Sequence, residues 1–183
     1  MQPEMWPQSF SEAKLLVQEA IDLFGKFRPE SFEWLIPFVL KNEGDWNTFV
    51  AMTREGTPVP IEETATFGLP KWFVMCRPCW DMMTDLGRSD PRSSIEELLQ
   101  HVFWRQHLIY RRAQFADLIA STMIRGESFY DGVKIDADEL CCAAARQVSN
   151  ARFPITNYPN LPLKDCDQIW CKCTWSPVRG DDR

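Results

Sequence analysis

The sequence predicts a mainly α protein: a helical bundle with a long central helix and an extended, metal-stabilised C-terminal segment. Apolar residues recur at helical intervals through much of residues 1–149, and one such pattern runs from 93 to about 125 without Gly or Pro. Three prolines in residues 150–165 forbid helix there. We therefore expect a helical domain over 1–149 and an extended Cys-rich segment over 150–183, packed on it as one structural unit.

The first two helices follow from capping signals and periodic apolar residues. Ser9 and Glu12 have the spacing of a capping box, and the helix after them is expected to end at Gly25. Pro29 suits the first turn of a second, mostly buried helix, in which Pro37 is expected to cause a kink or a restart. Two helices, the second bent, are therefore expected near the start of the chain.

Shorter elements are predicted before the long helix. Asp45 can cap a helix that stops at Gly56, and residues 57–70 are rich enough in Pro and Gly to indicate an irregular connection. A helix ending at Gly87 is expected next. Asp90 can then cap the long helix, which we expect to be the spine of the fold.

The last predicted helix begins at Asp136, which can cap the residues ADELCCAAARQV. Cys142 lies farther than Cys141 from the apolar stripe of this helix. We therefore expect Cys142 to be available as a ligand and Cys141 to be a core residue. The stripe is formed by Leu140, Ala144 and Val148.

The composition indicates a folded, acidic chain. Apolar residues make up 45% and aromatic residues 13% of the sequence, and the net charge is −6. Residues 1–141 hold 14 basic and 22 acidic residues, whereas 142–183 hold 6 basic and 4 acidic. This balance argues against nucleic acid as the main partner. Because the sequence has neither a signal-like start nor a long apolar run, we expect a cytoplasmic protein without a membrane segment.

Three cysteines, Cys166, Cys171 and Cys173, fall within eight positions near the end of the chain. In an extended segment residues two apart point to the same side, so Cys171 and Cys173 can face one point and a turn can bring Cys166 to them. A tetrahedral zinc site needs a fourth thiolate, for which Cys142 is preferred. We expect these four cysteines to bind structural Zn²⁺. Another soft metal, buried free thiols, and a redox or Fe–S role are alternatives.

Basic side chains near this site in sequence can offset the negative charge of four thiolates or donate to their sulfur atoms. The bound metal is expected to pin the proline-rich segment against the last helix. The four basic candidates are Lys164, Lys172, Arg146 and Arg152.

The stretches CAAARQVSNARF, YPNLPLKDC and CKC form a recognisable pattern. It resembles the C-terminal signature of a family of small, uncharacterised bacterial proteins, which reads Cys, Ala-Ala, Arg-Phe, Pro, Leu-Pro-Leu, Cys and Cys-x-Cys. The resemblance covers about residues 142–183 and implies a cysteine site on Cys142, Cys166, Cys171 and Cys173, with no established activity. The chain departs from the pattern in having Trp175 in place of a tyrosine and an ending less rich in arginine.

A second cysteine pair, Cys76 and Cys79, forms a C-x-P-C motif similar to that of thioredoxin-like proteins. In that interpretation Cys76 is the attacking thiolate, Cys79 the resolving thiol, and Arg77 a charge that favours the thiolate. The helical pattern that follows lacks the strands of a thioredoxin fold. A second metal half-site and simple packing are the other interpretations of this pair.

The remaining polar candidates give weaker signals. His101 and His107 are six residues apart on a helix and point in different directions, so they do not predict a shared metal site. Arg111 and Arg112 beside aromatic residues can bind a nucleic acid, although a solvated face is the favoured interpretation. The sequence has no Gly-rich phosphate loop, no G-x-S-x-G and no H-E-x-x-H, the usual marks of nucleotide-binding enzymes and hydrolases.

Eight tryptophans exceed what the core of a small bundle easily holds, and exposed tryptophan favours protein interfaces. The leading hypothesis is therefore a non-enzymatic, zinc-stabilised adaptor, inhibitor or regulatory subunit that binds another protein through an aromatic face. One alternative is a thiol-disulfide oxidoreductase using Cys76 and Cys79. A third possibility is nucleic-acid binding through Arg111, Arg112 and the basic tail.

Overall fold

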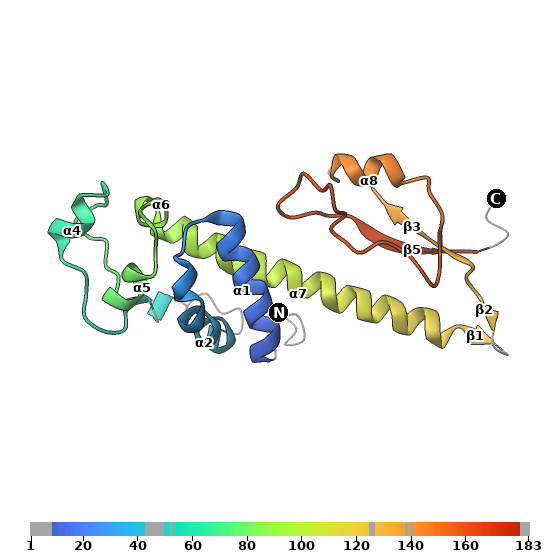
Figure 1. Ribbon diagram of the computed structural model, residues 1–183, viewed down its shortest axis with the longest axis horizontal. Coiled ribbons are helices and arrows are strands. Elements are labelled where there is room, and N and C mark those ends of the chain that lie inside the picture. The colour runs from blue at the N-terminus through green and yellow to red at the C-terminus, as the bar shows by residue number, and fades with distance from the viewer. Residues whose placement is uncertain are drawn as a thin grey trace. The chain divides into compact units, whose positions relative to one another are not determined.

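The computed structural model divides the chain into two compact units (Figure 1). Unit 1 is Met1–His107 and unit 2 is Leu108–Arg183, and the division falls within the helix α7 (Pro91–Ser121). The predicted boundary at residue 149 differs from this division, because a strand before that residue pairs with strands after it. The residues described are 9–42, 50, 51, 53–124, 127–137, 139 and 141–179.

Unit 1 is built from helices. Ser9 caps the first of them by accepting a hydrogen bond from the Glu12 N–H at 3.2 Å, and Gly25 ends it with a φ of 61°, as predicted. The long helix predicted from residue 93 to about 125 is also found, as α7, which ends earlier than predicted, at Ser121, before a short strand. The shorter elements are α1 (Phe10–Phe24), η2 (Pro29–Ser31), α2 (Phe32–Asn42), α4 (Ile61–Ala65), α5 (Arg77–Asp81) and α6 (Asp85–Ser89).

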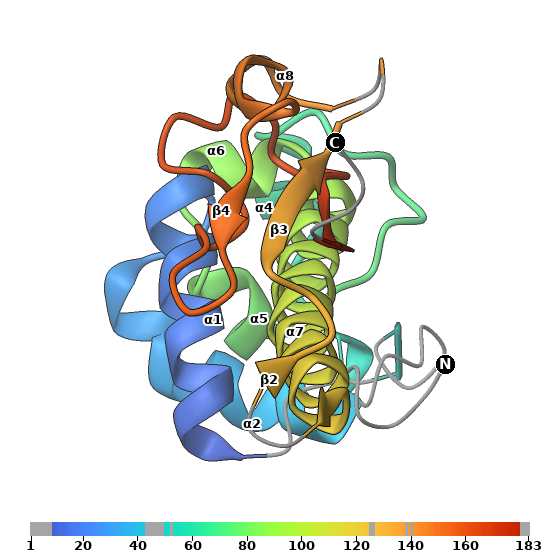
Figure 2. The same cartoon turned by 90° about the vertical axis from the view of Figure 1, so that its right-hand side faces the viewer.

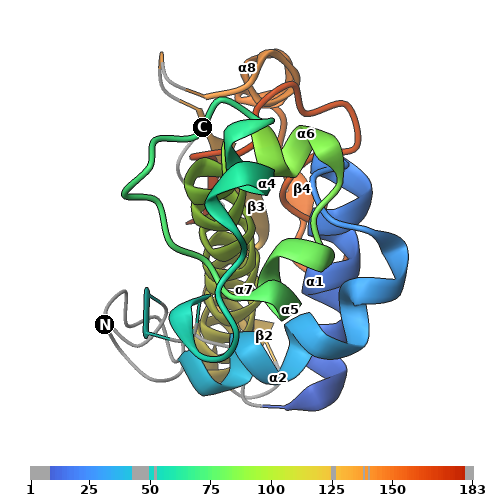
Figure 3. The same cartoon turned by 90° about the vertical axis from the view of Figure 1, so that its left-hand side faces the viewer.

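The core of unit 1 lies among α1, α2, α5 and the first half of α7, which Figure 3 shows side by side. Trp80 of α5 is the largest side chain that is completely buried, and its indole N–H donates to Glu63 Oε1 at 2.7 Å. Without this bond, burial of the ring would leave the indole N–H as an unsatisfied hydrogen-bond donor. The other fully buried large side chains of this core are Leu16, Val17, Ile36, Val39, Met83, Leu98 and Val102.

Some expectations for unit 1 need correction. The second helix does not restart at Pro37 but runs through it, and the Glu33 carbonyl that loses its N–H donor belongs to an exposed residue that water can reach. The helix predicted to end at Gly87 is divided into α5 and α6, because Thr84 caps a new helix with its hydroxyl oxygen. Residues 57–70 include α4. The predicted cap Asp45 lies outside the described residues.

An antiparallel sheet of three strands forms the centre of unit 2, and Figure 2 shows two of them, β3 and β4, side by side. The strand order is β4-β3-β5. The central strand β3 (Gly132–Asp136) pairs with β4 (Phe153–Pro154) and β5 (Thr174–Val178). A separate pair consists of β1 (Met123–Ile124) and β2 (Glu127–Ser128), and α8 (Ala143–Val148) lies between β3 and β4 in the chain.

The helix predicted from Asp136 is wrong over its first half. The strand β3 ends at Asp136, and Val133 and Ile135 are buried while Lys134 and Asp136 are exposed. Alternation with a period of two, carried by β-branched residues, is the signal of a half-buried strand. The mainly α expectation therefore holds for most of the chain, and the C-terminal segment is partly sheet.

The helices of the described segments are not of the membrane-spanning kind. None of them is both long enough and apolar enough to cross a bilayer.

A partly buried ion pair joins α1 to α7 within unit 1. Glu19 accepts hydrogen bonds from Arg105 Nε at 2.7 Å and Nη2 at 2.9 Å, and its Oε2 lies 3.5 Å from His101 Nε2. Burial raises the pKa of Glu19, but the hydrogen bonds from Arg105 and His101 outweigh this and lower the pKa from 4.5 to about 2. The folded chain therefore keeps this carboxylate charged in acid.

Glu19→Gln should make the stability of the protein less dependent on pH. Below about pH 4.5 Glu19 is protonated in the unfolded chain, but in the folded chain it stays ionised down to about pH 2. The contribution of Glu19 to the free energy of unfolding therefore falls as the pH decreases from about 4.5 to about 2. Because Glu19 is about a third exposed, we expect the substitution to cost about 1 kcal/mol at neutral pH. Urea denaturation of both proteins at neutral pH and near pH 3 checks this. Equal pH dependence in the two proteins would contradict it.

Candidate metal centre

Four cysteines of unit 2 come together near the start of α8. Cys142 is the N-cap of that helix, Cys166 lies in the loop between β4 and β5, and Cys171 and Cys173 lead into β5. The Sγ atoms of Cys142, Cys166 and Cys171 all lie within 4.8 Å of one another. Cys142 Sγ is 3.9 Å from Cys171 Sγ and 3.9 Å from Cys173 Sγ. These four residues, here called the thiol cluster, can hold a metal ion.

Part of the spacing of the cluster fits a small tetrahedral ion, although Cys173 lies outside the group of three sulfur atoms that are all within 4.8 Å of one another. Four sulfur atoms about 2.3 Å from a central zinc ion define a tetrahedron with edges of about 3.8 Å. Both separations measured from Cys142 Sγ are 3.9 Å. Cys142, Cys171 and Cys173 are each at most 3% exposed, so protein surrounds most of the site. The donor set consists of soft sulfur atoms, which prefer zinc, copper(I) and iron–sulfur centres.

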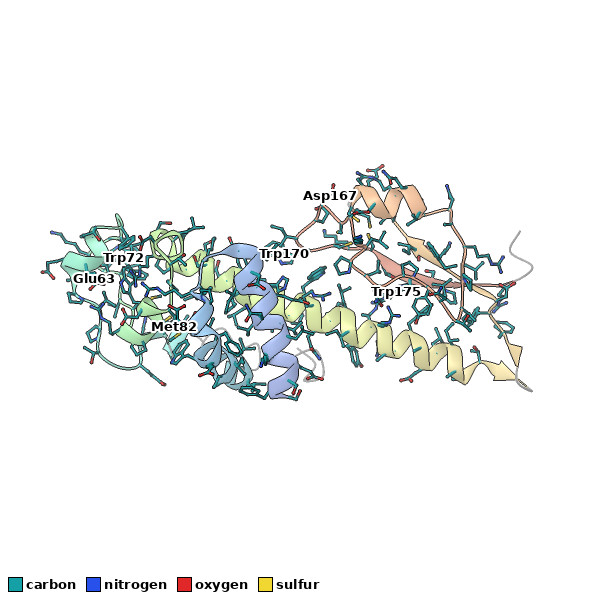
Figure 4. The ribbon with its side chains drawn as sticks, in the orientation of Figure 1. Glu63, Trp72, Met82, Asp167, Trp170 and Trp175 are labelled. Atoms are coloured by element: carbon teal, nitrogen blue, oxygen red, sulfur yellow. The ribbon has the colours of Figure 1, made fainter. Side chains whose placement is uncertain are left out.

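The register of the sheet brings the cysteines together. Asp136 at the end of β3 pairs with Thr174 at the start of β5. The chain that enters β5 therefore carries Cys173 past the segment that leaves β3 toward α8 and holds Cys142. A loop of residues 167–170 separates Cys166 from Cys171, and the Ala143 N–H donates to Asp167 Oδ1 at 3.3 Å. Figure 4 shows Asp167 and Trp170 in this loop.

The thiols of the cluster have unequal proton affinities. Burial would raise the pKa of Cys142, but the Ala145 N–H, 3.4 Å from its sulfur, and the neighbouring thiols together lower that pKa. Burial and the nearby thiols of Cys142 and Cys171 raise the pKa of Cys166 to about 12. Burial and the Cys171 thiol likewise raise the pKa of Cys173. Four thiols so close together ionise fully only if a cation lies among them.

The neighbouring Cys141 borders the cluster as a fifth thiol. Its Sγ lies 4.0 Å from the Asp136 carbonyl oxygen, which can accept the thiol proton, and it also hydrogen-bonds with Cys173. The helical-stripe argument for preferring Cys142 is wrong, because α8 begins only at Ala143. Cys142 belongs to the cluster for another reason: as N-cap, its sulfur faces the first turn of α8 and accepts from the Ala145 N–H.

The four predicted basic neighbours of the site have other surroundings. Arg146 donates to the Glu139 carbonyl at 3.2 Å. Arg152 pairs with Asp131 and donates to the Arg179 carbonyl at 2.8 Å, and its side chain also crosses Gly132, where a Cβ atom would lie 2.6 Å from Arg152 Nε. Lys164 and Lys172 are exposed. Backbone N–H groups reach cluster sulfur atoms instead: that of Ala145 donates to Cys142, that of Gln168 to Cys166 and that of Cys142 to Cys173.

The second cysteine pair lies in unit 1 and is nearly inaccessible. Cys76 is 1% exposed and Cys79 is 2% exposed. A hydrogen bond from the Cys79 thiol lowers the pKa of Cys76 to about 6, against the opposing effect of burial. The structure therefore brings these two thiols together within unit 1.

The other sequence candidates take part in local packing. His101 is buried beside Glu19, and His107 stacks on Phe103 at 6.4 Å. The Arg112 guanidinium lies over the rings of Tyr158 and Trp175, at 5.0 and 5.9 Å from their centroids. Sequence reasoning did not predict this arrangement, because the aromatic partners are more than forty residues from Arg112 in the chain.

Comparison of the chain with protein-family models, with curated proteins and with solved structures found no match. The resemblance of residues 142–183 to a bacterial C-terminal signature therefore stays a prediction.

Substitution of Cys142 and of the adjacent Cys141 shows which of the two binds the metal. Cys142→Ser should abolish stoichiometric metal binding, because it removes the sulfur from which both 3.9 Å separations are measured. Cys141→Ser should still bind one ion, since the Asp136 carbonyl can accept from a hydroxyl as it does from the thiol. Cobalt(II) titration monitored by thiolate-to-metal absorption distinguishes the two variants. If Cys142→Ser kept the full absorption signal, the assignment of Cys142 as a ligand would be wrong.

Proposed function

We propose that unit 2 is a zinc-stabilised module that binds another protein, so that the chain acts as an adaptor, inhibitor or regulatory subunit. In this proposal the thiol cluster holds Zn²⁺, and the loop of residues 167–170 contacts the partner. The observation that carries the proposal is the pair of 3.9 Å separations between Cys142 Sγ and the Sγ atoms of Cys171 and Cys173. They equal, within about 0.2 Å, the edge of a tetrahedral zinc–thiolate site.

The donor set favours a structural zinc ion over a catalytic one. Four cysteines complete a tetrahedron, so no coordination position is left for water or substrate. A single ion with four thiolate ligands is typical of structural zinc, whereas a catalytic zinc site usually has three protein ligands. We therefore assign the cluster a role in holding the chain together.

The part of unit 2 that needs such support is the segment between α8 and β5. Its regular structure is limited to β4, a strand of two residues. A metal ion bound by Cys142, Cys166, Cys171 and Cys173 would link the start of α8 to both ends of the 167–170 loop. Binding of structural zinc contributes several kcal/mol or more to folding, enough to order a segment with so few backbone hydrogen bonds.

The 167–170 loop supports the binding role. Ile169 and Trp170 are 51% and 40% exposed, at the tip of a loop with a cluster cysteine at each end. Asp167 ties the loop to Ala143. Apolar groups on a loop that is already ordered lose little conformational entropy when they bind, and tryptophan is enriched among residues that dominate binding energy. A protein with an apolar pocket is the partner that suits this surface.

The other function classes have less support. The exposed carboxylates of Asp165, next to the loop, and of Asp167, within it, disfavour phosphate groups, and the Arg112 guanidinium lies over two aromatic rings. The sulfur atoms of Cys76 and Cys79 are too deeply buried for the disulfide of a protein substrate to reach them in the folded chain. These observations favour a protein-binding role over nucleic-acid binding or disulfide exchange.

Metal analysis tests the zinc assignment. We expect one zinc ion per purified chain, and removal of it should lower the thermal stability of unit 2 by an amount that corresponds to several kcal/mol. Cys171→Ser should reproduce this loss, whereas Cys76→Ser, which removes a thiol outside the cluster, should keep the zinc. Zinc-free protein with unchanged melting would refute the assignment.

Substitution at the loop tests the binding role separately. The double variant Ile169→Ser/Trp170→Ser should keep its zinc and its melting temperature but lose partner affinity by about tenfold or more. Trp72→Ser, which alters a tryptophan that is 80% exposed in unit 1 (Figure 4), is the matched control and should bind normally. Affinity chromatography from the native host identifies the partner, and calorimetry measures each variant. If the double variant and the wild type bound the partner with equal affinity, the loop would not be the binding surface.

A further inference from the structure

Cys76 and Cys79 form a thiol pair that the metal centre does not use. Cys76 is the N-cap of α5, and Cys79 is three residues later, within its first turn. Residues with this spacing lie one above the other on a helix. A hydrogen bond joins the two thiols. The sulfur atoms are therefore already neighbours in the reduced protein.

The backbone around the pair is held by hydrogen bonds to other segments. The Cys76 N–H donates to the Thr53 carbonyl at 2.7 Å, and the Arg77 N–H donates to the Thr57 carbonyl at 2.8 Å. The Trp80 N–H donates to the Cys76 carbonyl at 3.1 Å. These bonds fix the residues on both sides of Cys76, so the two sulfur atoms keep their mutual position.

The cover over Cys76 is thin. Gly56 is exposed and has a φ of 112°, a conformation that favours glycine, and a Cβ atom there would lie 3.9 Å from Cys76 Cβ. The exposed backbone of Gly56, which has no side chain, therefore passes close to this cysteine. A molecule about as large as water can pass such a cover after a small local opening, whereas a protein disulfide cannot.

We propose that Cys76 and Cys79 are a peroxide-reactive dithiol that closes to an intrachain disulfide. The Cys76 thiolate attacks one oxygen of hydrogen peroxide, the O–O bond breaks, and hydroxide leaves, so Cys76 becomes a sulfenic acid. The Cys79 sulfur then attacks the Cys76 sulfur, the S–O bond breaks, and water leaves with the Cys79 proton. The two thiols lose two electrons, and hydrogen peroxide, with its released hydroxide protonated by solvent, becomes two water molecules.

The charges around the pair suit these two roles. The hydrogen bond from Cys79 lowers the pKa of Cys76 to about 6, although burial and the nearby Glu55 raise it. The same hydrogen bond, together with burial, raises the pKa of Cys79, which keeps its proton. Arg77, expected to favour the thiolate, is directed instead to Glu63 at 2.6 Å and Asp81 at 3.3 Å. One thiolate and one thiol are therefore available at neutral pH.

Peroxide treatment of the full-length, zinc-loaded protein tests the proposal. After treatment and alkylation, mass spectrometry should find the peptide with Cys76 and Cys79 two hydrogen atoms lighter and unalkylated, and dithiothreitol should reverse this. The rate should rise as the pH passes through about 6 and level off above it. Full alkylation of both cysteines after peroxide would overturn the proposal. So would a reaction rate that keeps rising up to the pH at which an ordinary thiol loses its proton.

Two variants separate the roles of the cysteines. Cys79→Ser should stop at the sulfenic acid of Cys76, which dimedone traps, and Cys76→Ser should react at least about tenfold more slowly. If peroxide instead releases zinc and links cysteines of the thiol cluster while Cys76 and Cys79 stay reduced, the proposal fails and the zinc assignment stands. Loss of zinc binding in untreated protein would leave this test of unit 1 unaffected.

Discussion

Mutual proximity of four thiols is the constraint on which unit 2 depends. The sulfur of Cys142 lies 3.9 Å from two others, within a buried site. Four charges of one sign cannot occupy that volume unless a cation compensates them, and four protons there would leave each thiol with poor hydrogen-bond partners. In the proposed function a dication bound by the four sulfur atoms removes both difficulties. It would hold the start of α8, the loop before Cys171 and the start of β5 together.

The sheet and a group of aromatic rings also hold the C-terminal segment in place. Trp175 of β5 is paired with Ile135 of β3, its ring contacts those of Phe115 and Tyr158, and its indole N–H donates to the Pro159 carbonyl at 2.9 Å. Arg112 covers Tyr158 and Trp175. The proline-rich segment is thus attached at Pro159 by a hydrogen bond and at the cysteines by the proposed metal. Between these two attachments the chain needs no regular secondary structure.

Local signals in the sequence predicted what is local in the structure. The caps of α1, the presence of the long helix α7 and the closeness of Cys166 and Cys171 all follow from residues near one another in the chain. The strand β3 was missed because Asp136 is a good helix cap, and that signal competed with the alternation of Val133 and Ile135. Its partners β4 and β5 begin 17 or more residues later, where no local pattern reveals them. The contacts of Arg152 were missed for the same reason, since they depend on the sheet that brings Gly132 beside it.

The two cysteine sites differ in what their surroundings allow. The pair at Cys76 and Cys79 has one sulfur inclined to lose its proton and one inclined to keep it, which suits a reaction between the two. The cluster around Cys142 has enough sulfur ligands to enclose an ion, which suits structure. X-ray absorption at the zinc edge of the purified protein distinguishes a four-thiolate site from other sites. We expect a single shell of four sulfur atoms at about 2.3 Å; a shell that contains nitrogen or oxygen ligands, or no zinc at all, would refute a structural zinc ion in the thiol cluster.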